Sequence, residues 1–238
     1  MVLFQLTIMR FITIYIAQGF IFAFFLFLAI KILKRDRKRL NVIFAGFYIS
    51  PVIGFFVNFI YGPMTDYNLV LLLNFVTNFG IYYSAIFLVV FDLILLKSEK
   101  VITTKKQTLI FLAYGIAMFC MIFFLFIPGA GVTLNNWSPV WSLPFFIYVV
   151  LVVSLGAVIP FLYLSFQIYK KFEDEVLKKK WKFFIYGFCC LIVFMYGIFV
   201  SNTLDIPIFR TVLGVIGLIL AIAGGYLMYN GVGRQLEK

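Results

Sequence analysis

The chain has 238 residues, of which 64% are hydrophobic and 12% are charged, and 32 of them are phenylalanine. A soluble domain needs far more polar surface than this, so the composition indicates a helical membrane protein and excludes an ordinary globular one. The formal net charge of +11 would suggest nucleic-acid binding in a soluble chain, but the positions of the cations point elsewhere.

Seven apolar segments follow one another along the chain. Most are close to the length of about 20 residues that a helix needs to cross the hydrocarbon core of a membrane. They cover residues 11–33, 40–60, 69–96, 107–128, 144–167, 182–201 and 210–230. Continuous apolar runs favour helices over the alternating strands of a membrane barrel. The predicted fold class is therefore all-α, a polytopic bundle of seven transmembrane helices that forms one integral membrane domain over residues 1–238.

Lysine and arginine gather in alternate connectors, after the first, third and fifth segments, and in the C-terminal tail. These cations are Lys31, Lys34, Arg35, Arg37, Lys38, Arg39, Lys97, Lys100, Lys105, Lys106, Lys170, Lys171, Lys178, Lys179, Lys180, Lys182, Arg234 and Lys238. They are eighteen of the twenty cations, and only Arg10 and Arg210 fall on the other side. Cytoplasmic loops carry such an excess, so we expect the N-terminus outside the cell membrane and the C-terminus in the cytoplasm. The basic loops would contact anionic lipid headgroups, and no nucleic-acid partner is expected.

The third segment carries polar residues on one face. At 100° per residue, Asn74 and Asp92 project at the same angle, and Asn78 and Tyr82 lie close to them. Such a face is costly against lipid and must contact protein or water. One interpretation is hydrogen bonding between helices, with Asp92 in an interfacial ion pair with a lysine such as Lys97. The others are a ligand-sensing or conformational-switch face, and a pathway for protons or ions.

The outer connector at about 128–143 is the longest on its side of the membrane and contains Trp137 and Trp141. Tryptophan favours the interface between membrane and water. The connector is therefore either an interfacial anchor or a lid over an outward-facing ligand pocket. In the second case, the candidate ligand-binding residues are Asn74, Asn78, Tyr82, Trp137 and Trp141.

The connector between the fifth and sixth segments predicts a basic helical hairpin over residues 168–182. Asp174 and Glu175 precede lysines by four residues, a favourable order for ion pairs on a helix. The hairpin is either a solvated basic face or a surface for a cytoplasmic partner. Its candidate contact residues are Lys170, Lys171, Lys178, Lys179 and Lys180.

The seventh segment carries small residues at the spacing of helical turns. They are Gly214, Gly217, Ala221 and Gly225. Small residues at this spacing permit membrane helices to approach one another closely. They predict close packing within the bundle or, alternatively, a homodimer.

The chain lacks the residues that most catalytic sites require. It contains no histidine, which excludes serine–histidine and cysteine–histidine pairs, histidine-bound zinc and phosphorelay through histidine. Asp92 is the only carboxylate within a predicted span, whereas an intramembrane aspartyl protease needs two. The cysteines, Cys120, Cys189 and Cys190, lie in apolar segments and are interpreted as packing residues. We therefore expect no enzyme activity, no cofactor and no metal site.

Several features match a known arrangement. A polar, aromatic stretch at 136–141 precedes the fifth segment, Pro160 lies within that segment, and Gly187 lies near the start of the sixth. Together with seven spans, an exterior N-terminus and the basic hairpin, this resembles the seven-transmembrane N-terminal sensor module of microbial histidine kinases. The resemblance implies a module that detects an outer or membrane signal. Because no kinase domain follows the seventh segment, the resemblance implies either a module that signals through a partner or one whose role has changed.

These observations favour a non-enzymatic, seven-helix membrane sensor or receptor-like protein. We expect its ligand among the outer halves of the helices and its signal to be relayed to a cytoplasmic signalling protein by the hairpin 168–182. The alternatives are a small seven-helix transporter or channel, and a structural subunit of a membrane complex.

Overall fold

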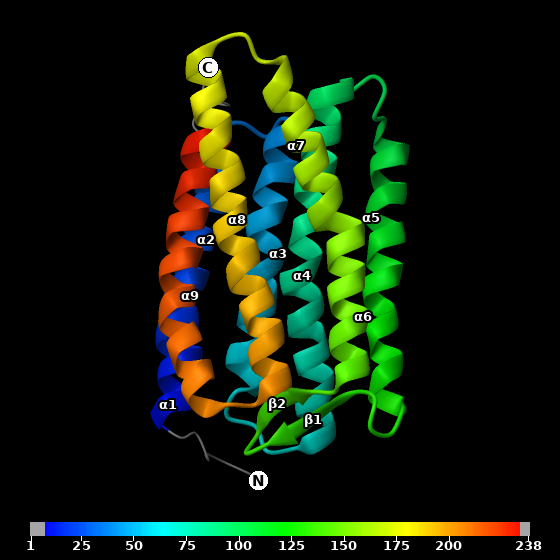
Figure 1. Ribbon diagram of the computed structural model, residues 1–238, viewed down its shortest axis with the longest axis vertical. Coiled ribbons are helices and arrows are strands. Elements are labelled where there is room, and N and C mark those ends of the chain that lie inside the picture. Colours follow the sequence, from blue (N-terminus) through cyan, green and yellow to red (C-terminus); the bar gives the residue numbers. More distant parts are fainter. Residues whose placement is uncertain (1–7, 234–238) are drawn as a thin grey trace.

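The computed structural model describes residues 8–233. Seven helices in this part of the chain are long and apolar enough to cross a membrane, and they stand side by side in one bundle (Figure 1). They cover Ile12–Arg35, Arg39–Tyr61, Tyr67–Lys97, Thr104–Phe126, Leu143–Lys171, Glu175–Leu204 and Pro207–Val232. The predicted helical fold and the predicted number of spans are confirmed. The chain is a multi-pass membrane protein by the length and composition of its helices.

Several spans are built from more than one helical segment. The first span is preceded by α1 (Ile8–Phe11) and contains a π-helical turn η1 (Ile12–Ala17) and α2 (Gln18–Arg35). The second and third spans are α3 (Arg39–Tyr61) and α4 (Tyr67–Lys97). The fourth contains α5 (Thr104–Phe119) and a 3₁₀ segment η2 (Cys120–Phe126). The fifth contains α6 (Leu143–Val153), a π-helical turn η3 (Ser154–Val158) and α7 (Ile159–Lys171). The sixth is α8 (Glu175–Leu204), and the seventh contains α9 (Pro207–Met228) and a π-helical turn η4 (Tyr229–Gly233).

Side-chain caps fix where several helices begin. Asp66 accepts a hydrogen bond from the Leu69 backbone N–H at 2.9 Å before the third span, and Asp174 accepts one from Val176 at 2.7 Å before the sixth. An N-cap of this kind satisfies a backbone donor that has no partner inside the helix. The cap at Asp174 starts α8 seven residues before the predicted beginning at 182, because the intervening lysines are good helix formers.

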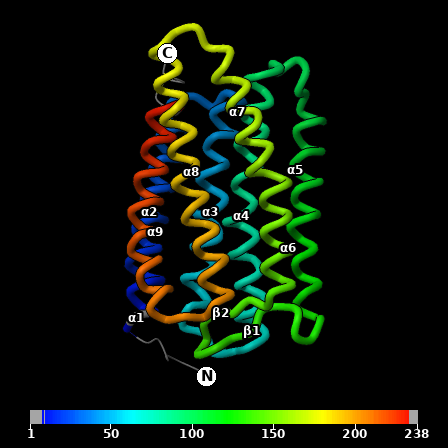
Figure 2. The backbone as a smooth tube through the Cα atoms, viewed as in Figure 1, coloured from blue at the N-terminus to red at the C-terminus, as the bar shows by residue number. Residues whose placement is uncertain are grey.

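The connectors rich in lysine and arginine lie at one end of the bundle. The α2–α3, α4–α5 and α7–α8 connections meet at this end, together with the last turns of the seventh span (Figures 1 and 2). The start of the first span, the α3–α4 connection and the α8–α9 connection lie at the opposite end. Cations separated along the sequence are therefore gathered at one end of the molecule. Arg234 and Lys238 lie outside the described residues.

A two-stranded hairpin covers part of the end opposite to the basic connectors (Figure 1). Strands β1 (Val132–Asn135) and β2 (Ser138–Trp141) pair antiparallel, with Asn135 opposite Ser138. The turn residues Asn136 and Trp137 have φ angles of 47° and 62°, as in the two-residue turns that match the twist of paired strands. The sequence analysis predicted a connector here but no strands, because tryptophan is an unusual residue at a positive φ.

The seventh span also approaches α8 closely at a glycine outside the predicted set of small residues. A Cβ atom placed on Gly187 of α8 would lie 2.6 Å from the Gly224 carbonyl oxygen, and one placed on Gly224 of α9 would lie 2.7 Å from the Gly187 carbonyl oxygen. Both distances are too short for a real Cβ. Glycine at both positions therefore permits the backbones of α8 and α9 to touch.

The predicted small residues behave in two ways. Gly217 faces the ring of Phe194, and Gly225 packs against Phe24 and Phe25 of α2. Ala221 is also buried. These three residues pack within the chain, which is one of the two predicted alternatives. Gly214 does not: a Cβ atom there would have no neighbour within 4 Å, and the prediction that it packs against a helix is wrong for the chain itself.

Aromatic side chains fill the half of the bundle nearest the basic connectors. Phe44, Phe91, Phe161 and Phe184 have no exposed surface. The ring centroids of Phe44 and Phe91 are 5.4 Å apart, and those of Phe161 and Phe184 are 5.5 Å apart. Rings at these separations pack favourably. These four residues form an aromatic layer in the core of the bundle at that level.

Candidate ligand-binding site

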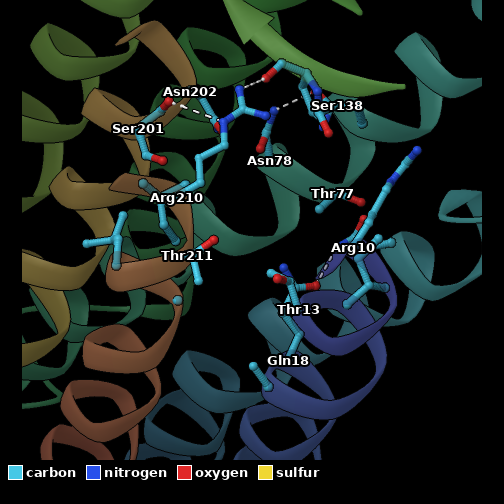
Figure 3. Close-up of a pocket in the computed structure, with 18 of the residues that line it drawn as sticks. Arg10, Thr13, Gln18, Thr77, Asn78, Ser138, Ser201, Asn202, Arg210 and Thr211 are labelled. Atoms are coloured by element: carbon cyan, nitrogen blue, oxygen red, sulfur yellow. Dashed lines mark hydrogen bonds between the residues drawn. The ribbon is translucent and has the colours of Figure 1, made fainter. Parts of the chain in front are cut away.

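A cavity of about 690 Å³ lies in the half of the bundle that carries the β-hairpin. Its walls come from the start of the first span, from α3 and α4, from the hairpin, and from the facing ends of α8 and α9 (Figure 3). Small-molecule sites in proteins have volumes of about 300–1,000 Å³. The cavity is therefore large enough to hold a small organic ligand.

Two arginines line this cavity, and they are the two cations that the sequence separates from the basic connectors. Arg10 comes from α1 and Arg210 from the first turn of α9. In Figure 3 the Arg210 head group lies beside Ser138 of the hairpin, Arg10 extends from the start of the first span, and Gln18 lies farther from the hairpin. The lining also includes one carboxylate, Asp205. The mouth of the cavity therefore has a net positive charge.

Hydrogen bonds hold the Arg210 side chain at the mouth. Its Nη2 atom donates to the Pro139 carbonyl oxygen at 2.7 Å and lies 3.0 Å from a carboxylate oxygen of Asp205. The second Asp205 oxygen accepts a hydrogen bond from the Asn135 side chain at 2.7 Å. Arg210 is thus tied both to β2 and to the α8–α9 connection. The guanidinium is positioned before any ligand arrives.

The polar face predicted on the third segment borders the cavity as a ladder of hydrogen bonds. The Tyr82 hydroxyl donates to Asn78 Oδ1 at 3.2 Å, and Asn78 Nδ2 donates to Asn74 Oδ1 at 3.0 Å. Asn74 Nδ2 in turn donates to the Tyr61 hydroxyl of α3 at 2.9 Å. All four side chains line the cavity and are buried. Each amide nitrogen has two N–H groups and uses one in the ladder, so this amide ladder both joins α4 to α3 and presents donors to the cavity.

Other polar residues of the site were not found by the sequence analysis. Asn58 donates to Gln18 across α3 and α2, and Thr77 donates to the Gly54 carbonyl oxygen at 3.1 Å. Gln18, Asn58 and Thr77 all line the cavity. The signal in the sequence for this end of the bundle is the isolation of Arg10 and Arg210 from every other cation.

The structure does not bring Trp137 or Trp141 into the lining, so the hypothesis that these two residues bind the ligand is wrong. Trp141 is 2% exposed and packs behind Tyr82, with ring centroids 6.2 Å apart. Its indole N–H is buried without a hydrogen-bond partner among the described residues. Trp137 forms the tip of the hairpin. The hairpin lines the cavity instead through residues that include Asn135 and Ser138.

Asp92 lies near the basic end and has no exposed surface. The Ser165 hydroxyl of α7 donates to one of its oxygens, and the Ser165 carbonyl oxygen accepts a hydrogen bond from the Trp181 indole at 2.9 Å. Within residues 8–233, the ion pairs do not include Asp92 or Lys97. The expected pair with Lys97 is therefore replaced by a hydrogen bond to Ser165, which joins α4, α7 and α8.

The basic hairpin has the predicted form but different internal pairs. Lys170 and Lys171 end α7, and Lys178, Lys179 and Lys180 lie in the first turns of α8. Lys178 pairs with Glu175 at 2.7 Å. The predicted partner of Lys178, Asp174, caps the helix instead. The three-residue loop between these helices places both groups of lysines at the basic end of the bundle (Figure 1).

No protein-family model, no curated protein and no solved structure matches this chain. Within residues 8–233, no cluster of three cysteine, aspartate or glutamate side chains is arranged to hold a metal ion. The cavity, its two arginines and the amide ladder are therefore the features from which a function is inferred.

Replacing Asn78 by leucine is expected to lower the free energy of unfolding by about 1–3 kcal/mol, because it leaves two buried partners without hydrogen bonds. Those partners are the Tyr82 hydroxyl and Asn74 Oδ1. Tyr82→Phe removes a single hydrogen bond and is expected to cost about 1 kcal/mol. Chemical unfolding of the purified protein measures both changes, and equal stability of Asn78→Leu and the wild type would contradict the ladder.

Proposed function

We propose that the chain is a non-enzymatic, seven-helix sensor or receptor-like protein of the cell membrane that binds an anionic ligand in the cavity. The observation that carries this proposal is the presence of Arg10 and Arg210 in one cavity lining. Guanidinium groups bind carboxylates and phosphates through paired, charge-assisted hydrogen bonds. Charged residues within membrane helices are costly and usually serve a function.

The charge distribution indicates on which side of the membrane the cavity lies. Eighteen of the twenty cations belong to the basic connectors and the C-terminal tail, and an excess of this kind is typical of cytoplasmic loops. The opposite end, with the β-hairpin and the cavity, would then face the outside. The N-terminus is outside and the C-terminus cytoplasmic in this arrangement.

A series of contacts supports a relay from the cavity to the basic hairpin. The amide ladder and Asp92 belong to the same helix, α4. Asp92 contacts Ser165 of α7, and Ser165 contacts Trp181 of α8. Trp181 directly follows the hairpin lysines Lys178–Lys180 in sequence. A ligand that binds more tightly to one arrangement of these helices would shift their equilibrium, and a cytoplasmic partner would read the shift at residues 168–182.

The interior supports a sensor over a channel. The aromatic layer of Phe44, Phe91, Phe161 and Phe184 is fully buried, and it lies between the cavity and the basic end. A channel needs a continuous polar path, and a transporter would have to open this layer during its cycle. The resemblance to sensor modules of histidine kinases points in the same direction as the closed interior.

Hexyl phosphate is a suitable probe for the proposed anion site, and hexanol is its neutral match. In nanodiscs of phosphatidylcholine, we expect hexyl phosphate to raise the melting temperature of the protein, whereas hexanol does not. Loss of one charge-assisted pair costs about 1.5–3 kcal/mol, so Arg10→Gln and Arg210→Gln should each weaken binding at least about 10-fold. Lys34→Gln, at the basic end, is the control and should bind like the wild type.

The relay is tested with spin labels on cysteines at positions 105 and 179, in a variant with its three native cysteines replaced. Saturating hexyl phosphate should change the distance between the labels. Hexyl phosphate binding that is unchanged by both arginine substitutions would refute the anion site. Binding without any movement of the labels would refute the relay, and uptake of hexyl phosphate into proteoliposomes would favour a transporter.

A further inference from the structure

A second, apolar cavity adjoins the first toward the middle of the bundle, and we call it the extension. This second cavity has a volume of about 60 Å³. It shares five wall residues with the first, namely Ile21, Phe55, Ile81, Phe194 and Ile198. The two cavities therefore adjoin along a shared apolar wall, along which an alkyl chain would pass from one to the other.

The extension offers almost no hydrogen-bond partners to a polar group. Ser84 is the one polar side chain among its lining residues, and its hydroxyl already donates to the Ile81 carbonyl oxygen at 2.6 Å. A polar group buried without a hydrogen bond is costly, whereas an alkyl group is not. The extension therefore selects an apolar occupant.

Two helices give the same distance between the polar mouth of the cavity and the apolar extension. On α4 the amide ladder begins at Asn74, and the extension is lined by Ala85, eleven residues later. On α9 the mouth is lined by Arg210, and the extension by Ala221, also eleven residues later. At 1.5 Å per residue, both intervals correspond to about 16 Å along the bundle.

We propose that this site binds a single-chain anionic amphiphile. Its phosphate or carboxylate head lies between Arg10 and Arg210 at the mouth, next to the amide ladder, and its alkyl chain extends toward Ala85 and Ala221. This inference rests on the proposed anion site, because the same arginines bind the head group. The extension is too narrow for the second chain of a membrane phospholipid, so the chain number is part of the proposal.

The test compares alkyl phosphates with six, ten and fourteen carbons, the corresponding carboxylates and the corresponding alcohols. Binding is measured by equilibrium dialysis against nanodiscs of phosphatidylcholine, with empty nanodiscs subtracted and the free aqueous concentration determined. Each buried methylene contributes about 0.8 kcal/mol, so decyl phosphate, with four more methylenes, should bind roughly 200-fold more tightly than hexyl phosphate. The phosphate and carboxylate series distinguish the two head groups.

A matched pair of substitutions locates the chain. Ala85→Leu fills the extension and should remove the advantage of decyl over hexyl phosphate. Ala23→Leu makes the same change at an exposed position of α2 outside both linings, and it should preserve the wild-type chain-length series.

The possible failures are distinct. Hexyl and decyl phosphate of equal affinity in the wild type would overturn the amphiphile and leave the anion site standing. Decanol that binds as tightly as decyl phosphate would overturn the anion site and with it the proposed function. If Ala85→Leu loses hexyl phosphate as well, the substitution has damaged the fold, and the wild-type series decides.

Discussion

Gly224→Leu prevents α8 and α9 from packing and is expected to lower the free energy of unfolding by about 3 kcal/mol or more. The first atom of any side chain at this position would lie 2.7 Å from the Gly187 carbonyl oxygen. This carbonyl oxygen belongs to the backbone, so it cannot rotate away as the end of a flexible side chain would. The two helices must separate, and the packing that surrounds their crossing is lost. Yield on size-exclusion chromatography and the midpoint of thermal unfolding measure the effect.

Gly214→Leu is the matched control for this experiment. It makes the same substitution on the same helix, but a Cβ atom at Gly214 has no neighbour within 4 Å. We expect the folded yield and the melting temperature of Gly214→Leu to equal those of the wild type or to exceed them, since leucine is a better helix former than glycine. A Gly224→Leu variant that is as stable as Gly214→Leu would show that α8 and α9 do not cross at Gly187.

Cysteine labelling on intact cells should distinguish the two ends of the bundle almost completely. In a variant without native cysteines, a membrane-impermeant maleimide should label Thr133→Cys in β1 fully. It should label Lys179→Cys to less than about a tenth, because a loop rich in lysine is not translocated across the membrane. Both side chains are exposed, so accessibility alone does not separate them.

Permeabilised cells provide the control, since both cysteines should then react equally. Labelling of Lys179→Cys from outside, with Thr133→Cys protected, would invert the bundle and place the cavity on the cytoplasmic side. Labelling of both cysteines from outside would contradict the prediction that the fifth helix, which separates them, crosses the membrane once.

The sequence was sufficient for features that depend on one segment. The seven spans were predictable because long apolar runs have few alternatives in lipid. The shared face of Asn74, Asn78 and Tyr82 followed from the period of one helix. The amide ladder is the structural form of that face, and both the hydrogen-bonding and the site interpretation of these three residues remain compatible with it.

Features that depend on how segments meet could not be predicted in the same way. Arg10 and Arg210 come from the two ends of the sequence, and their common cavity exists only because the first and last spans are neighbours in the bundle. Asp92 finds Ser165 on another helix rather than the lysine that follows it in the sequence. The contact between Gly187 and Gly224 likewise depends on the angle at which two helices cross, which the spacing of small residues in one helix does not determine.

The placement of two buried tryptophans gives the protein an intrinsic optical reporter at each end. Trp141 packs against the tyrosine of the amide ladder, and Trp181 donates to the serine that contacts Asp92. Indole emission responds to its immediate surroundings, so single-tryptophan forms retaining one or the other report separately on events at the hairpin end and at the basic end of the bundle. Conformational coupling across the bilayer is then measurable by fluorescence without any attached dye.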